Sequence, residues 1–169
     1  MKNILFTLAL LVSFSSFGQT AEEYFYRAYN KYKNVDYYGA ISDYTKAIEL
    51  NPDAPFNHLS YHQRGMAKLV LRDYYGAISD FTKAIELNPN YALAYLNRGL
   101  SKRFLKDYYG AIADYNKAIE LDPNYTIAYV NRGAAKELLG DMSGACADWK
   151  KAANLGHTNS AKWVANQCN

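Results

Sequence analysis

Charged side chains recur at fixed spacings along this 169-residue chain. Four arginines are each followed by a lysine four residues later and by an aspartate sixteen residues later. The arginines are Arg27, Arg64, Arg98 and Arg132, the lysines are Lys31, Lys68, Lys102 and Lys136, and the aspartates are Asp43, Asp80, Asp114 and Asp148. A guanidinium and a carboxylate can form paired, charge-assisted hydrogen bonds. Because the aspartates follow the arginines at the same distance throughout, we expect structural ion pairs; the alternative is a row of cations that binds an acidic ligand.

Two histidines are the residues whose spacing is most suggestive of a metal. His58 and His62 lie four residues apart, a spacing that can bind zinc on a helix. No glutamate motif accompanies them, and His157 is the only other histidine. The sequence also has no glycine-rich phosphate loop and no serine in a nucleophile-elbow context. We therefore expect no catalytic residue, no metal, no cofactor and no enzymatic activity.

The start of the chain reads as a signal peptide. It has a charged Lys2, an apolar run over residues 4–12, and a small-x-small sequence at residues 16–18. The apolar run is too short to span a bilayer. We expect residues 1–18 to be removed and residues 19–169 to form a single exported domain, periplasmic or extracellular, without stable membrane insertion.

The two cysteines, Cys146 and Cys168, both lie in the last quarter of the chain. An exported protein meets an oxidising compartment, which favours a disulfide between them. A free pair is the alternative, and no CxxC spacing or histidine pair near them supports a metal or redox site. The charge of the chain is nearly balanced, with 19 Lys and Arg against 16 Asp and Glu, and we expect no nucleic-acid partner.

A nearly identical segment occurs three times and then once more in degenerate form. Its Asp-Tyr-Tyr-Gly block starts at Asp36, Asp73 and Asp107, and the degenerate copy starts at Asp141. The steps of 37, 34 and 34 residues are typical of a helix-turn-helix repeat. Apolar residues follow helical spacing within each copy, and a proline ends the second helix in the first three. The sequence therefore predicts antiparallel helix pairs.

This pattern resembles the tetratricopeptide repeat. The signature aromatic, small and proline positions of the third copy are Tyr95, Gly99, Ala111, Tyr115, Ala118 and Pro123. The first copy departs from it at Ala28, where glycine is expected, and the fourth at His157, where proline is expected. The resemblance implies an all-α, right-handed α-solenoid of four helix-turn-helix units and a C-terminal capping helix. The units span residues 21–54, 58–91, 92–125 and 126–159, and the cap about 160–168.

The resemblance also implies a function, because the first helices of such units line a concave groove that binds polypeptides. Positions 2, 5, 6, 9, 12 and 13 of each unit usually face that groove. The residues that we expect to line it are Phe25, Tyr29, His62, Gln63, Met66, Leu93, Leu96, Asn97, Leu100, Phe104, Val130 and Asn131. We expect a non-catalytic scaffold or adaptor for a protein or peptide partner. The alternative is a structural module that uses the same apolar surface to form a homodimer.

Two further features bear on what the chain binds. The clamp with which some members of this family hold chaperone tails would fall at Phe25, Tyr29, Gln63, Leu93 and Asn97, and only Asn97 suits it, so we do not expect that mode of recognition. Tyrosines also recur just after the turn of each of the first three units. Tyr38, Tyr75 and Tyr109 either form an aromatic ladder for a ligand or close the turn, and we favour the second.

Overall fold

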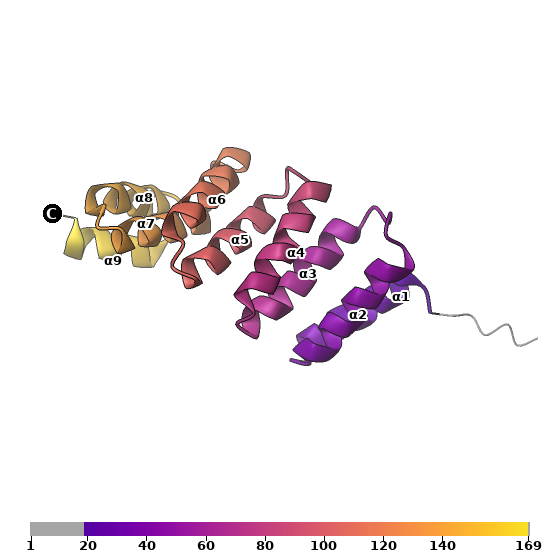
Figure 1. Ribbon diagram of the computed structural model, residues 1–169. Helices are drawn as coiled ribbons and strands as arrows, with labels where there is room; N and C mark the ends of the chain where they lie inside the picture. Colours follow the sequence, from indigo (N-terminus) through magenta and orange to yellow (C-terminus); the bar gives the residue numbers. More distant parts are fainter. Residues whose placement is uncertain (1–18, 169) are drawn as a thin grey trace, which may run out of the picture.

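The computed structural model describes residues 19–168, which form nine helices and no strands. The helices are α1 (Ala21–Lys33), α2 (Tyr37–Leu50), α3 (Asn57–Val70), α4 (Tyr74–Leu87), α5 (Ala92–Phe104), α6 (Tyr108–Leu121), α7 (Thr126–Leu138), α8 (Met142–Asn154) and α9 (Thr158–Gln167). Consecutive helices pair and stack into an elongated solenoid (Figure 1). The all-α solenoid expected from the sequence, with its final helix, is confirmed. The expected signal peptide lies outside the described residues.

The Asp-Tyr-Tyr-Gly block is the start of the second helix of each unit. Asp36 is the N-cap of α2, and its side chain accepts a hydrogen bond of 2.9 Å from the backbone N–H of Gly39. A Cβ on Gly39 would lie 2.1 Å from the Asp36 carboxylate, so this close cap requires glycine. The same bond recurs at Asp73, Asp107 and Asp141. The repeated block is therefore explained by capping.

A residue with a left-handed backbone conformation lies in the turn between the two helices of each unit. Val35, Arg72 and Lys106 adopt φ values of 67°, 64° and 65°, and Gly140 takes the same place in the fourth unit. The following aspartate then donates its backbone N–H to a carbonyl near the end of the first helix, as Asp36 does to Lys31 at 2.9 Å. This is the arrangement of a Schellman helix end, which favours glycine at the left-handed position. Three of the four turns form it with a non-glycine residue.

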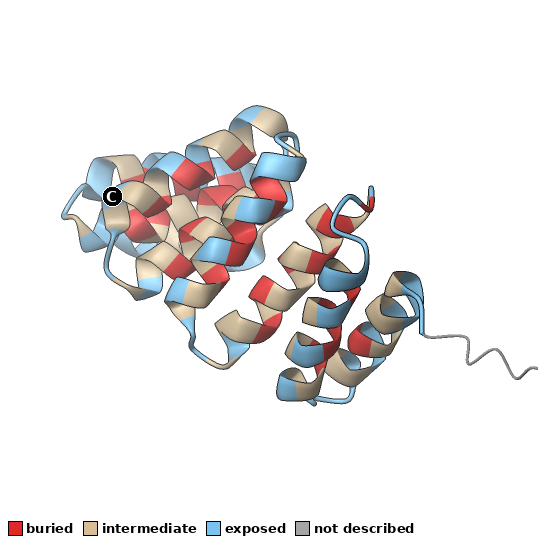
Figure 2. Ribbon diagram, turned by 45° about the vertical axis from the view of Figure 1, so that its right-hand side comes forward, coloured by how far each residue is buried: buried red, intermediate tan, exposed pale blue. Residues whose placement is uncertain are grey.

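The core consists of clusters of small and aromatic side chains between the helices. Buried residues line the surfaces where the helices face one another (Figure 2). A Cβ on Gly99 would lie 2.7 Å from the Tyr115 ring, so this glycine lets α5 and α6 approach closely. One core cluster combines Leu96 of α5 and Tyr115 of α6 with Ala128 of α7. Neighbouring units therefore share a core.

The three-residue insertion before the second unit is tied to the end of the first. Asn57 is fully buried at the start of α3. Its side chain donates hydrogen bonds to the backbone carbonyls of Asn51, at 2.8 Å, and of Pro52, at 2.6 Å. The helix therefore begins one residue before the expected unit boundary.

The last helix covers the end of the fourth unit. α9 packs against α8, with the rings of Trp149 and Trp163 5.6 Å apart. The expected disulfide is present and joins Cys146 of α8 to Cys168, just after α9. α9 begins at Thr158, two residues earlier than the expected cap. None of the helices that the structure describes is long and apolar enough to cross a membrane.

Candidate functional site: the inner wall

The first helices of the units form the inner side of the curved stack. Each first helix contacts the first helix of the next unit: α1 contacts α3, α3 contacts α5, and α5 contacts α7. Within residues 19–168, the second helices α2, α4, α6 and α8 do not contact one another to the same degree. The first helices are therefore closer to one another than the second helices are, and the stack curves towards them. We call the surface formed by α1, α3, α5 and α7 the inner wall.

The expected groove residues divide into three classes by burial. Tyr29, Leu93 and Phe104 are exposed. A second set is partly buried on the wall: Phe25, Gln63, Met66, Leu100, Val130 and Asn131. The remaining three, His62, Leu96 and Asn97, are buried. Nine of the twelve side chains therefore have surface that a ligand can reach.

The expectation that His62, Leu96 and Asn97 line the groove is wrong. Leu96 belongs to the core cluster that contains Tyr115, and the Asn97 Nδ2 atom lies 2.9 Å from His62 Nε2 inside the stack. All three lie in the two middle units, which have a helix pair on each side. The side chains at these positions are therefore covered by the neighbouring unit.

Burial also changes the acid–base behaviour of His62. Desolvation, with a smaller effect from the charge of His58, lowers the pKa of His62 to about 4. His62 is therefore neutral at neutral pH and packs against the rings of Phe81 and Tyr91. The His58 Nδ1 atom instead lies 3.1 Å from the carbonyl of Pro55. In the described part of the chain, no three potential metal ligands gather around these histidines or elsewhere.

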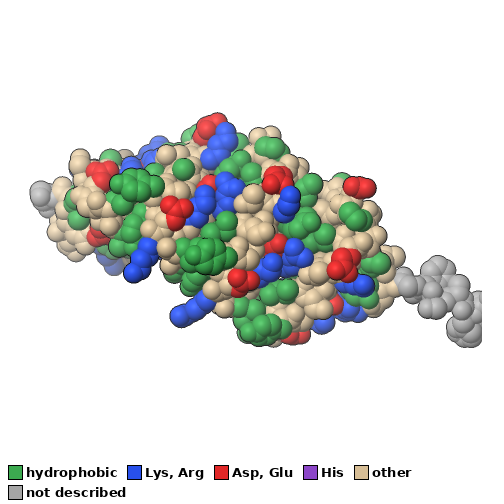
Figure 3. Space-filling view, in the orientation of Figure 1, with side chains coloured by type: hydrophobic (Ala, Val, Ile, Leu, Met, Phe, Trp, Pro, Cys, Tyr) green, Lys and Arg blue, Asp and Glu red, His purple; other side chains and the backbone are tan. Residues whose placement is uncertain are grey.

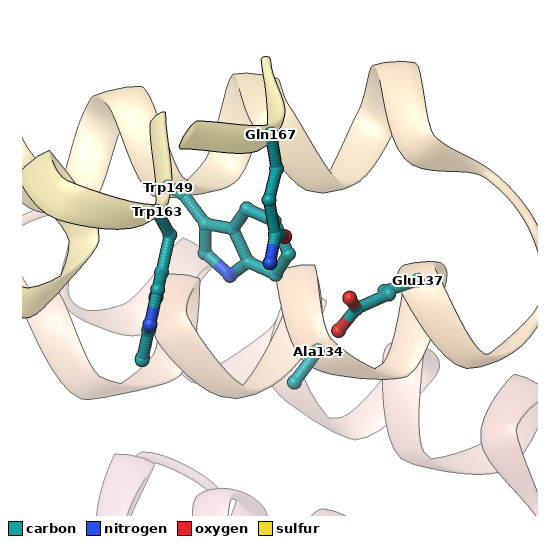
Figure 4. Close-up of a pocket in the computed structure, with 5 residues that line it drawn as sticks. All are labelled: Ala134, Glu137, Trp149, Trp163 and Gln167. Atoms are coloured by element: carbon teal, nitrogen blue, oxygen red, sulfur yellow. The ribbon is translucent and has the colours of Figure 1, made fainter. Parts of the chain in front are cut away.

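The inner wall has a hollow near each end. The N-terminal hollow, of about 130 Å³, is lined by Glu22, Phe25, Tyr26, Phe56 and Leu59. The C-terminal hollow, of about 270 Å³, is lined by Ala134, Glu137, Trp149, Trp163 and Gln167 (Figure 4). Trp163 and Gln167 come from α9, outside the repeats, so the repeat pattern alone does not point to them.

Comparison with known proteins identifies the family. The Arabidopsis OM64 TPR domain, a solved structure, is 30% identical over 70% of this chain and 96% of that domain, with a TM-score of 0.66. Models of the tetratricopeptide repeat match residues 59–91 and 92–125. The chain belongs to the tetratricopeptide repeat family.

Two other solved structures show the same likeness. The crystal structure of MamA is 27% identical over 84% of this tetratricopeptide repeat chain and 81% of that one, with a TM-score of 0.76. The first TPR of Spaghetti (RPAP3), solved with the HSP90 peptide SRMEEVD, is 29% identical over 72% and 94% of the two chains, with a TM-score of 0.68. Curated protein sequences give no match.

The repeated charges of this tetratricopeptide repeat protein form ion pairs within its own units. Arg64 contacts Asp80 at 2.7 Å, and Lys68 contacts the same buried carboxylate at 2.8 Å. Equivalent pairs form in the other three units, at Asp43, Asp114 and Asp148. In the first unit, hydrogen bonding from Arg27 is the main reason that the pKa of Asp43 is lowered. The alternative reading, a row of cations awaiting an acidic ligand, is therefore not what the structure shows.

Each arginine after the first also links its unit to the preceding one. The Nη1 atom of Arg64 donates to Thr45 at 2.9 Å, that of Arg98 to Thr82 at 3.2 Å, and that of Arg132 to Asn116 at 2.7 Å. In the first unit, Arg27 donates instead to Gln19 at 2.6 Å. The ion pairs therefore connect the units as well as the two helices of each unit.

The tyrosines after the turns do not close them. Tyr38, Tyr75 and Tyr109 are 76–77% exposed, so the reading that we favoured is wrong. The preceding tyrosine packs instead: the centroid of the Tyr37 ring lies 5.3 Å from that of Tyr32.

The surface of the molecule has no large area of one charge on the face that Figure 3 shows. Hydrophobic, acidic and basic side chains are interspersed there.

Proposed function

We propose that this protein is a non-catalytic scaffold that binds a partner polypeptide along its inner wall. The observation that carries the proposal is the exposed apolar surface of the wall. Tyr29, Leu93 and Phe104 are exposed on α1 and α5, and Met66 and Leu100 are partly exposed. Contiguous apolar surface on a soluble protein commonly marks an interaction site. An extended peptide or an amphipathic helix is the class of ligand that such a wall suits.

The wall also has polar side chains that can bind a peptide backbone. Gln63 and Asn131 are partly exposed, whereas Asn97 is buried against His62. The related Spaghetti domain was solved with an HSP90 peptide, SRMEEVD, that has two glutamates and an aspartate. At the corresponding clamp positions, Phe25, Tyr29 and Leu93 carry no positive charge. We therefore propose an apolar ligand segment rather than an acidic C-terminal tail.

A second copy of the chain is the alternative occupant of the wall. Copies could also associate end to end, and the two ends of the solenoid argue against that second arrangement. At the third and tenth positions of units two to four, small side chains are buried: Ser60, Ala94 and Ala128, and Ala67, Ser101 and Ala135. The first unit has Glu23 and Asn30 there, and both are exposed. At the other end, α9 covers α8. Among residues 19–168, the first unit therefore has polar side chains where the other units bury small ones, and the last unit is already covered.

Peptide display with matched variants tests the proposal. Peptides of twelve residues would be selected on the wild type and their Kd values measured against Leu93→Glu and Leu100→Glu on the inner wall. Tyr75→Glu and Tyr109→Glu introduce the same charge on the outer side, where the tyrosines are exposed. We expect the inner variants to weaken binding at least tenfold and the outer variants to leave it unchanged. Equal effects on both sides would refute the proposal.

Light scattering at several protein concentrations addresses the alternative. A monomer that binds the selected peptides supports the scaffold. A dimer that dissociates on Leu100→Glu, with no peptide selected, supports self-association instead. Leu96 is unsuitable for this test because it is buried in the core, where a glutamate would unfold the protein.

We also propose that the protein acts outside the cytoplasm. Support comes from the signal-like sequence of residues 1–18 and from the disulfide between Cys146 and Cys168. Mass spectrometry of the protein from fractionated cells tests this. A mature chain that starts near Gln19, with both thiols oxidised, is expected; an uncut, reduced chain in the cytosolic fraction would contradict the proposal.

A further inference from the structure

The C-terminal hollow exists because the fourth unit departs from the repeat. The ninth position of the first three units is a large side chain, Tyr29, Met66 and Leu100, whereas the fourth has Ala134. At the twelfth position the fourth unit has Glu137, whereas the other units have Tyr32, Leu69 and Arg103. Ala134 and Glu137 both line the hollow. A small side chain thus leaves the space open, and an acidic one stands beside it.

The opposite side of the hollow is aromatic. Trp149 comes from α8 and Trp163 from α9, and their rings are tilted by 57° with centroids 5.6 Å apart. Figure 4 shows both indoles, the Glu137 carboxylate and the Gln167 amide around one space. Trp149 is only 3% exposed and Trp163 is partly exposed, so the Trp163 indole supplies most of the electron-rich surface that is open to a cation.

The disulfide holds the part of this wall that the repeats do not supply. Cys168 follows Gln167 directly and is bonded to Cys146 of α8. The Cys146 sulfur also lies 3.9 Å from the Gln167 carbonyl. The end of α9 is thereby fixed against α8, which keeps Trp163 and Gln167 at the edge of the hollow.

Glu137 is available to a ligand. Among residues 19–168 its carboxylate has no hydrogen bond and no ion pair, and the residue is exposed. The neighbouring cation, Lys136, is bound to Asp148 at 2.9 Å. An acidic ligand group would be repelled by Glu137, and a purely apolar one would leave it without a counter-charge. A cation meets both the carboxylate and the indole rings.

We infer that the C-terminal hollow binds a basic side chain, arginine or lysine, of the polypeptide held by the inner wall. The inference rests on the proposed function and makes it more specific, because it fixes one residue class of the ligand and its position near α7 and α9. The arginine guanidinium suits the hollow better than the lysine ammonium, since its flat face can stack on an indole while its edge bonds a carboxylate.

Intrinsic fluorescence gives a direct readout, because the only two tryptophans of the chain both line the hollow. The probes are two blocked hexapeptides, acetyl-Leu-Leu-Gly-Leu-Arg-Leu-amide and its counterpart with citrulline, the neutral isostere of arginine. We expect the arginine peptide to shift the fluorescence saturably and to bind about fivefold more tightly than the citrulline peptide. Equal affinity for the two, or no saturable shift with the arginine peptide up to millimolar concentration, would overturn the inference.

Two variants test the roles of the named residues. Glu137→Gln removes the charge at constant size and should reduce the preference for arginine, leaving only the contribution of the indole surface. Ala134→Leu restores the side chain of the third unit and should abolish the fluorescence shift. Glu120→Gln is the control, because Glu120 is an exposed residue of α6 that contacts Lys117; it should leave both unchanged. An arginine preference that Glu137→Gln leaves undiminished refutes the inference even if Ala134→Leu fails to fold.

The outcome separates this inference from the proposed function. If display peptides bind the inner wall without preferring arginine over citrulline, the scaffold stands and the basic-residue site fails. If the arginine peptide shifts the fluorescence and Leu100→Glu has no effect on binding of the display peptides, the basic-residue site stands and the proposed wall fails.

Discussion

The ion pair between Arg98 and Asp114 offers a quantitative test of how the units are joined. Replacing Arg98 with methionine removes the guanidinium and keeps most of the apolar stem. Arg98 Nη2 lies 2.6 Å from Asp114 Oδ1, and Arg98 Nε lies 3.0 Å from Asp114 Oδ2. The Asp114 side chain is 5% exposed, so water cannot replace these bonds. Breaking a buried ion pair by removing one partner costs about 3–5 kcal/mol when the remaining charge is uncompensated.

The structure predicts a smaller cost, because Asp114 keeps a second cation. Lys102 Nζ remains 2.8 Å from Asp114 Oδ2. Loss of the charged hydrogen bonds from Arg98 should therefore lower the free energy of unfolding by about 2 kcal/mol. The double variant Arg98→Met with Lys102→Met strands the carboxylate and should cost about 4 kcal/mol.

The first unit supplies the control. Arg27 forms the same pair with Asp43, but its side chain is 40% exposed and, within residues 19–168, its Nη1 atom donates to Gln19 and not to the second helix of another unit. Arg27→Met should therefore cost clearly less than Arg98→Met, because an exposed ion pair contributes little to stability. Urea unfolding followed by circular dichroism measures these differences, with the slope on urea concentration checked for constancy. Equal costs at Arg27 and Arg98, or no cost at Arg98, would refute the assignment of the arginines as links between units.

Three further perturbations follow from the cap, the buried histidine and the turns. Replacing both Cys146 and Cys168 with serine should lower the free energy of unfolding by about 3 kcal/mol, which is the loop-closure estimate for a separation of 22 residues. The same change should red-shift the emission of Trp163. An unchanged melting temperature would contradict the stabilising role of the disulfide. Between pH 7 and pH 4 the wild type should lose about 3 kcal/mol of unfolding free energy that the His62→Gln variant does not lose. The reason is that the histidine takes up a proton near pH 6.5 in the unfolded chain but only near pH 4 in the folded one. Parallel curves of urea stability against pH for the two proteins would rule this out. Val35→Gly should raise the free energy of unfolding by about 1 kcal/mol, because a β-branched residue is strained at φ 67° and the exposed Val35 side chain contributes little packing. A thermal melt measures this, and a fall in melting temperature would contradict the strain.

The repeat made most of the fold predictable. Helical spacing, a 34-residue period and the prolines after Leu50, Leu87 and Leu121 mark the helix pairs directly in the sequence. The arginine and aspartate spacing likewise pointed to pairs within each unit. Their bonds to Thr45 and Thr82 of the preceding units were not anticipated, because they depend on how units stack.

The site was less predictable, because burial depends on both neighbours of a unit. Leu96 and Val130 share one position of the repeat, yet the first is buried and the second partly exposed. Tyr37 and Tyr38 are adjacent, and only their places on the first turn of α2 decide which packs. The C-terminal hollow requires Trp163, which no repeat position contains.

The most direct test of the central claim is hydrogen exchange with a peptide selected by display. Amide protection on peptide binding would be measured along the whole chain. The inner-wall account predicts that the added protection falls on α1, on α3, on α5, which carries Leu93 and Leu100, on α7, and at the junction with α9. Protection confined to α2, α4, α6 and α8, around the exposed Tyr75 and Tyr109, would contradict it.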